Sequence, residues 1–91
     1  MAESAPLVQL LAGRWTLALL GELSSGGRRY QELRVVLDGI SHKVLTETLR
    51  RAERGGLIRR QLDHDRIETA TLYQLTELGR SLELPLSAFG Q

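Results

Sequence analysis

The residues best suited to chemistry are polar side chains that recur at helical spacing in the middle of the chain. Projected at about 100° per residue, one set falls within about 100° of arc. It consists of Lys43, Thr46, Glu47, Arg50 and Arg54, with His42 and Ser41 at its N-terminal margin. Lysine and arginine can donate hydrogen bonds to guanine, threonine can bond a polar base edge or touch a thymine methyl group, and glutamate can accept from cytosine. The spacing therefore predicts a helix face that recognises base pairs in the major groove of DNA.

Basic residues around this face are suited to phosphates, which position a protein on DNA without specifying sequence. They are Arg28, Arg29, Arg51 and Arg54. Residues 28–60 carry nine basic and four acidic side chains, although the formal net charge of the whole chain is only +1. A basic centre between acidic flanks is typical of a surface that binds a polyanion. The alternative is a set of solvated helix faces without such a partner.

Other kinds of chemistry find little support in the sequence. No nucleophile has a neighbouring base and no pair of carboxylates indicates a cleft, so we do not expect an enzyme. The chain contains no cysteine, and His42 and His64 lack the spacing of metal ligands, so we expect no metal and no cofactor. His42 is instead a candidate for a DNA contact that depends on pH. Glu47 has an equally good alternative role as the ion-pair partner of Arg50 or Arg51.

A long apolar helix is predicted from about Ala5 to Leu23. Pro6 suits the first turn of a helix, and apolar residues follow it at spacings of three, four and seven. The helix carries more apolar surface than one side of a small core needs. We therefore expect part of it to face a second subunit.

Two shorter helices are predicted on either side of a glycine turn. The first runs from Tyr30 to a stop at Gly39, where glycine allows the left-handed backbone that reverses a chain. The second follows Ser41, a natural N-cap, and runs to about Arg54. Its inward side is expected to hold Val44, Leu45, Thr48, Leu49 and Ala52. Such a pair matches the helix-turn-helix geometry, in which the second helix lies in the major groove.

A β-hairpin is predicted after these helices, because Leu57–Leu62 and Thr69–Leu75 have the composition of strands. A hairpin in this place is the wing of a winged-helix domain. Thr76 then caps a last helix, in which Leu78, Leu82 and Leu86 are spaced by four. We expect one α+β, mostly helical domain over residues 1–91: a winged helix-turn-helix with a two- or three-stranded wing and helices at both ends.

Several motifs resemble, in the same order, those of the HxlR-type winged-helix transcriptional regulators, which are related in architecture to the MarR group. They are Gly13-Arg14-Trp15, Arg29 to Leu33, Gly39 to Thr46 with Leu49, Gly56-Leu57-Ile58 and Tyr73 to Gly79. Each motif is weak alone, but together they are specific and cover nearly the whole chain. The resemblance implies a homodimer that binds double-stranded operator DNA as a local repressor or activator. It also implies dimer contacts from the first and last helices, for which the candidates are Leu7, Leu10, Leu11, Trp15, Leu82 and Leu86.

Two positions depart from that resemblance. Relatives often carry a proline pair before the last strand, where this chain has Glu68 and Thr69. The acidic residues of the hairpin leave His64 and Arg66 as its attractive contacts to DNA, so we expect a weak contact from the wing. Many relatives also have a cysteine before the proline that begins the first helix, where this chain has Ala5. Sensing through that thiol is not expected.

A winged-helix protein-interaction or dimerisation module is the main alternative, because a fold does not determine a function. It predicts an apolar or acidic outward face on the third helix, whereas the face found here is basic and polar. No segment approaches the roughly 18 consecutive apolar residues of a membrane span, and the N-terminus lacks the features of a signal peptide. We expect a cytoplasmic protein without a membrane partner. A small-molecule effector could lie between the first helix and the core of a dimer, but no residue identifies one.

Overall fold

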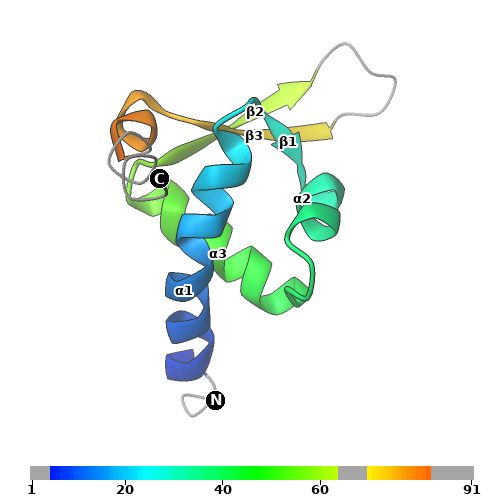
Figure 1. Ribbon diagram of the computed structural model, residues 1–91, viewed down its shortest axis with the longest axis vertical. Helices are drawn as coiled ribbons and strands as arrows, with labels where there is room; N and C mark the ends of the chain where they lie inside the picture. Colours follow the sequence, from blue (N-terminus) through cyan, green and yellow to red (C-terminus); the bar gives the residue numbers. More distant parts are fainter. Residues whose placement is uncertain (1–4, 64–69, 83–91) are drawn as a thin grey trace, which may run out of the picture.

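The expected helices and strands are present in the computed structural model, which describes residues 5–63 and 70–82 (Figure 1). In chain order they are α1 (Ala5–Leu23), β1 (Arg28–Arg29), α2 (Tyr30–Val36), α3 (His42–Arg54), β2 (Ile58–Asp63) and β3 (Ala70–Leu75). Residues 77–82 are also helical. The α+β, mostly helical class predicted from the sequence is confirmed.

The turn between α2 and α3 has the backbone that the sequence predicted. Gly39 has a φ of 92°, a conformation that costs little without a Cβ atom. The hydroxyl of Ser41 accepts a hydrogen bond from the backbone N–H of Val44 at 3.1 Å, so Ser41 is the N-cap of α3. The sequence predicted the start of α3 correctly. It predicted that α2 would stop only at Gly39, whereas α2 ends at Val36.

The C-terminal end of α3 is closed by a Schellman motif. The N–H of Leu57 donates to the carbonyl of Ala52 at 2.9 Å, and the N–H of Gly56 donates to that of Glu53 at 3.0 Å. Gly56 has a φ of 77°, which this motif requires. The chain is thereby turned directly from α3 into β2.

The sheet has three antiparallel strands in the order β1-β3-β2. In its register, Ile58 of β2 lies opposite Leu75 of β3, and Arg28 of β1 lies opposite Tyr73 of β3. The sequence predicted β2 and β3 to within one residue at each boundary but did not assign β1. Two residues are too short to show a period, so this strand exists only through its pairing with β3.

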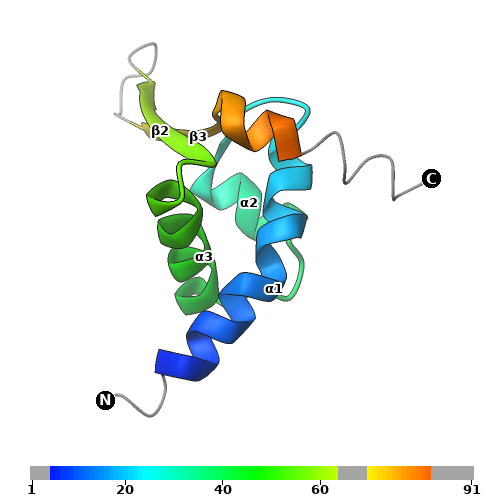
Figure 2. The ribbon, with the colours of Figure 1, turned by 90° about the vertical axis from the view of Figure 1, so that its left-hand side faces the viewer.

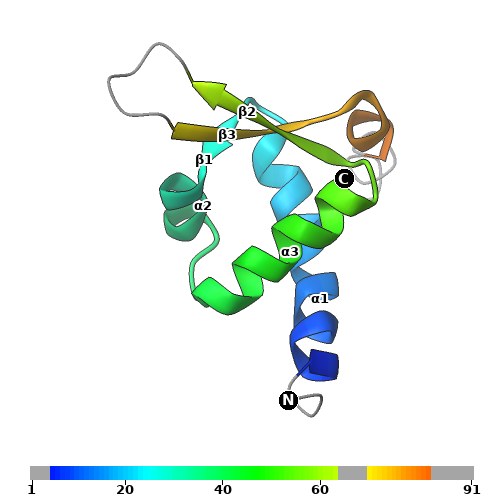
Figure 3. The same ribbon diagram turned by 180° about the vertical axis from the view of Figure 1, so that it is seen from behind.

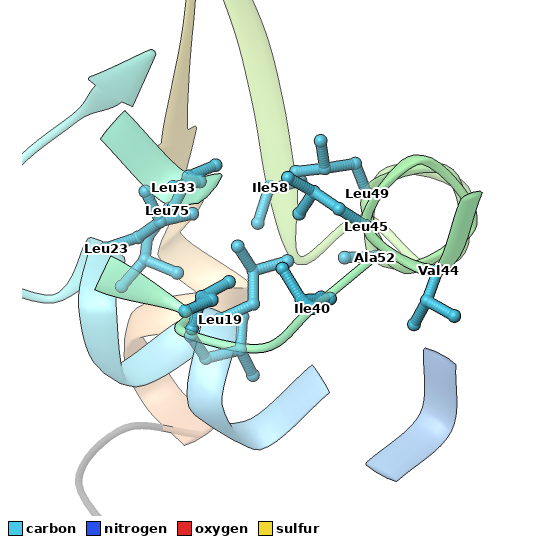
Figure 4. Close-up of a cluster of buried hydrophobic side chains, with 12 residues drawn as sticks. Leu19, Leu23, Leu33, Ile40, Val44, Leu45, Leu49, Ala52, Ile58 and Leu75 are labelled. Atoms are coloured by element: carbon cyan, nitrogen blue, oxygen red, sulfur yellow. The ribbon is translucent and has the colours of Figure 1, made fainter. Parts of the chain in front are cut away.

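The core lies where α1, α2 and α3 meet the sheet (Figure 4). The inward residues predicted for α3 are all buried: Val44, Leu45, Thr48, Leu49 and Ala52. They pack with leucines from α1, among them Leu19 and Leu23, and with Ile58 and Leu75 of the sheet. Trp15 and Tyr73 are half-buried and pack against the same cluster.

Helices α1 and α3 form the largest helix-helix contact, and they converge toward the N-terminal end of α1 (Figure 2). Seen from behind, α3 lies across the front of α1 and turns its other side away from the domain (Figure 3). Among the described residues, no helix combines the length and apolar character that crossing a bilayer requires.

Candidate nucleic-acid interface

The outward side chains of α3 share one surface, as the helical projection predicted. His42, Lys43, Thr46, Glu47 and Arg50 line a cleft of about 540 Å³. Val8 and Gln9, from the first half of α1, complete the cleft. Lys43 and Arg50 are exposed, while Thr46 and Glu47 are half-buried. The arrangement places hydrogen-bond donors and acceptors side by side on one accessible face.

The ion pairs of α3 determine which charges this face offers. The guanidinium of Arg54 donates to the carboxylate of Glu47 at 3.3 Å, two turns away along the helix. The sequence suggested Arg50 or Arg51 as the ion-pair partner of Glu47. In the structure the partner is Arg54 instead. Within residues 5–63 and 70–82, Lys43 and Arg50 make no ion pair. These two side chains are therefore the cations available to an incoming anion.

Arg51, a predicted phosphate contact, lies on a different side of α3. Its guanidinium is so close to α1 that a Cβ atom on Gly13 would be 3.8 Å from Nη2 of Arg51. Together with Gln9, Leu10 and Arg14 it lines a second groove, of about 460 Å³, between the two helices. The structure thus separates Arg51 from the face that carries Lys43 and Arg50.

Arg28 and Arg29, also predicted as phosphate contacts, form strand β1 and are half-buried. Nε of Arg28 donates to the carbonyl of Glu22 at 3.3 Å, and its Nη2 lies 4.0 Å from the Glu22 carboxylate. The backbone N–H of Arg29 donates to the carboxylate of Glu32 at 2.7 Å, at the start of α2. Both residues therefore have contacts within the domain that join β1 to its neighbouring helices.

One contact at the interface was not foreseen. Tyr30 and His42, the first residues of α2 and α3, meet across the turn, where the Tyr30 hydroxyl is hydrogen-bonded to Nδ1 of His42. Their rings pack edge to face, with centroids 5.4 Å apart. Twelve residues separate the two in sequence, so no local periodicity could have indicated the contact.

The candidate dimer residues fall into two groups. Leu7, Leu10 and Leu82 are exposed, whereas Leu11 and Trp15 are half-buried against the domain's own core. Leu17, which the sequence did not single out, is 57% exposed and lies two turns after Leu10 on the same side of α1. That spacing of seven was the signal that could have identified it. Leu86, His64 and Arg66 lie outside the described residues.

Metal ligands do not gather in the part of the chain that the structure describes: no three histidine, cysteine, aspartate or glutamate side chains lie together there.

Comparison with known proteins links this chain to transcriptional regulators. Residues 10–91 match the HxlR-like helix-turn-helix family. The chain is 34% identical over 76 residues to the HTH-type transcriptional regulator YtcD of Bacillus subtilis. This match covers 84% of this chain and 60% of that protein. The chain is also 38% identical over 82 residues to the HTH-type transcriptional regulator sll1512 of Synechocystis. This match covers 90% of this chain and 60% of that protein. The chain thus spans about 60% of the length of these curated relatives.

Solved structures agree with the sequence matches. A transcriptional regulator of the MarR family from Enterococcus faecalis V583 is similar with a TM-score of 0.78 and 36% sequence identity. The superposition covers 98% of this chain and 81% of that one. The winged-helix fold predicted from the hairpin that follows the third helix is confirmed.

Proposed function

The chain belongs to the HxlR-like helix-turn-helix family of transcriptional regulators, and from this premise we propose that it binds operator DNA as a homodimer with α3 in the major groove. The observation that carries the proposal is the outward face of α3. Lys43 and Arg50 are accessible and without an ion pair in the described residues, and they flank Thr46 and Glu47 in one cleft. These side chains are of the types that recognise base edges.

The recognition helix is held firmly for such a task. Its inner side is buried against α1 and the sheet, its first turn is capped by Ser41, and its last turn is closed by the Schellman motif. A helix fixed at both ends presents its side chains in one geometry. Two copies related by a dimer axis would recognise half-sites one turn of DNA apart, about 34 Å.

Phosphate contacts in this proposal come from basic residues that do not line the cleft. Arg54 lies closest in sequence, but it first has to leave the carboxylate of Glu47. Arg28 likewise has to leave the carboxylate of Glu22 before it can contact a phosphate. Both ion pairs are at least partly exposed, and such pairs are worth only about 0–1 kcal/mol, so a phosphate can replace the carboxylate at little cost.

The homodimer rests on the exposed leucines of α1. Leu7, Leu10 and Leu17 are more than half exposed and lie on one side of the helix. Burying them against a second copy would remove this apolar surface from water, at about 25 cal/mol per Å². The rival function, a protein-interaction module without DNA binding, would require an apolar or acidic face on α3.

Selection of DNA from a random pool by the purified chain, followed by anisotropy titrations of the selected duplex, tests the function. If six phosphates of the duplex are neutralised, affinity should fall on the order of 10³-fold between about 50 and 200 mM salt, because bound counterions are released. Failure to enrich any duplex, or an affinity that stays level with salt, would favour the protein-interaction module.

A further inference from the structure

The contact between Tyr30 and His42 links the buried part of the domain to the edge of the recognition face. Tyr30 is half-buried and packs against the core cluster. His42 is exposed and lines the cleft that also contains Lys43 and Arg50. An exposed imidazole is thereby linked through one hydroxyl to a side chain that packs against the core.

The hydrogen-bonding groups of the pair determine which tautomer of His42 is present. The Tyr30 hydroxyl is hydrogen-bonded to Nδ1 of His42, and it can alternatively donate to the His42 carbonyl oxygen at 3.4 Å. A hydroxyl has one proton to donate. The carbonyl of the first helical residue already accepts the N–H four residues later, as in any α-helix. In residues 5–63 and 70–82, Nδ1 has no other hydrogen-bond partner.

The Tyr30 hydroxyl therefore makes its better hydrogen bond by donating its proton to Nδ1 of His42. A neutral imidazole that accepts at Nδ1 carries its own proton on Nε2. The ring then offers an N–H donor from its far nitrogen, at the N-terminal end of α3. The N-terminal residues of a recognition helix are those that meet base edges in helix-turn-helix proteins.

We propose that Tyr30 is a positioning residue for DNA binding, which holds His42 as an Nε2–H donor to a hydrogen-bond acceptor on DNA. The acceptor is a phosphate oxygen or the N7 atom of a purine, both of which bind N–H donors. This inference rests on the proposed function, because it requires that the start of α3 meets DNA. It adds a positioning side chain from α2 to the proposed interface.

Nitrogen-15 NMR of the free chain at alkaline pH, where imidazoles are neutral, tests the tautomer without any DNA. We expect the proton of His42 on Nε2, and a shift toward a mixture of tautomers in Tyr30→Phe, which keeps the aromatic ring and loses only the hydroxyl. A proton found on Nδ1 in the unsubstituted chain would overturn the proposal.

A double-mutant cycle on the duplex selected by the chain tests positioning. Tyr30→Phe and His42→Ala should each weaken binding about threefold to tenfold, the size of one hydrogen bond. The double variant should be no weaker than His42→Ala alone, because Tyr30 acts through His42. A purely structural role for the hydroxyl would instead lower the affinity of the His42→Ala background as well, and that result would overturn the proposal.

A conservative variant separates positioning from packing. His42→Gln carries an amide donor that does not need the Tyr30 hydroxyl, so adding Tyr30→Phe to it should leave its affinity for the selected duplex unchanged. A further threefold loss in that background would contradict the inference.

Modified duplexes identify the acceptor. A 7-deazapurine at one position should abolish the difference between the unsubstituted chain and His42→Ala if the acceptor is N7, and a methylphosphonate should do so if it is a phosphate. If neither kind of substitution at any position has this effect, the DNA contact of His42 is refuted. Failure to select any duplex would refute the proposed function itself, whereas the NMR result on the free chain would still decide the tautomer.

Discussion

Glu47 lowers the positive charge that the outward face of α3 presents. Its carboxylate lies 3.3 Å from the Arg54 guanidinium, and it is half-buried among the residues of the cleft. A carboxylate in this place repels phosphates and holds the guanidinium of Arg54 in an ion pair. It could accept a hydrogen bond from the amino group of a cytosine. We therefore expect the side chain to oppose non-specific binding of DNA, which depends mainly on charge.

Replacement Glu47→Gln should accordingly strengthen binding to DNA of random sequence. The change removes one negative charge and releases Arg54, so we expect an affinity about twofold to tenfold higher at low salt. The slope of log K against log salt should steepen by about one unit. Anisotropy titrations on a random duplex measure both quantities.

Glu53→Gln is the matched control for that experiment. Glu53 has the same kind of partner, Arg60 at 2.9 Å, but it does not line the cleft of α3. This variant should change affinity less than Glu47→Gln does. Equal effects of the two replacements, or weaker binding of random DNA by Glu47→Gln, would show that Glu47 does not limit non-specific binding.

At the scale of the elements, the start of α3 depends on a single hydroxyl. Ser41 accepts the N–H of Val44, which would otherwise be one of the unpaired donors at a helix N-terminus. Ser41→Ala should lower the free energy of unfolding by about 1 kcal/mol, within a range of about 0.5–2 kcal/mol. Urea denaturation measures the change.

Two variants accompany this prediction. Ser41→Asp keeps a capping oxygen and should retain most of the stability. Ser25→Ala changes an exposed serine in the loop after α1 and should have almost no effect. An unchanged stability in Ser41→Ala would mean that the cap does not hold the start of the recognition helix.

The junction between the end of α3, β2 and the last helical segment depends on a close approach of two backbones. A Cβ atom on Gly79 would lie 2.2 Å from the carbonyl oxygen of Leu57, which is far too close. That carbonyl also accepts the N–H of Thr76 at 3.0 Å, so it is not free to move. We expect Gly79→Ala to lose about 1–3 kcal/mol of stability, as overpacked sites do.

We expect Gly21→Ala to have the opposite effect on stability. A Cβ atom there would have no heavy atom within 4 Å, and Gly21 lies inside α1. Alanine should therefore raise stability by up to about 1 kcal/mol, because glycine is the poorer helix former. The two melting temperatures should move in opposite directions. A Gly79→Ala variant as stable as the unsubstituted chain would refute the close approach.

The sequence predicted those elements whose signal is local. The boundaries of α1 and the two sides of α3 followed from apolar spacing, and the turn followed from Gly39. Strand β1 could not be predicted, because it depends on a partner strand about forty residues later in the chain. The same reason applies to the position of Arg51 beside Gly13 of α1, which its place along α3 did not indicate. The Tyr30–His42 contact likewise depends on how two helices pack.

At the scale of the whole molecule, the exposed side of α1 should decide the oligomeric state. Leu10 and Leu17 are 61% and 57% exposed, seven residues apart on one side of the helix. Replacing both with serine should shift the chain toward the monomer in sedimentation velocity experiments, without loss of helical content. Both side chains already face solvent in the single copy, so its own core is not disturbed.

Val35→Ser is the control for the dimer experiment. Val35 is 77% exposed, but it lies on α2, away from the exposed leucines of α1. This variant should sediment like the unsubstituted chain. A chain that is monomeric at all concentrations, or a Leu10→Ser/Leu17→Ser variant that still dimerises, would show that this side of α1 is not the interface.

We propose above all that the outward face of α3 recognises base pairs. The most direct measurement is the affinity of Lys43→Ala and Arg50→Ala for the selected duplex and for duplexes with single base-pair changes. Arg80→Ala, an exposed arginine on the last described helical segment, is the control.

We expect Lys43→Ala or Arg50→Ala to lose about 1–3 kcal/mol of binding free energy and to become indifferent to the base pair at one position. Arg80→Ala should keep both affinity and preference. Unchanged affinity and preference in both cleft variants would contradict the assignment of α3 as the recognition helix.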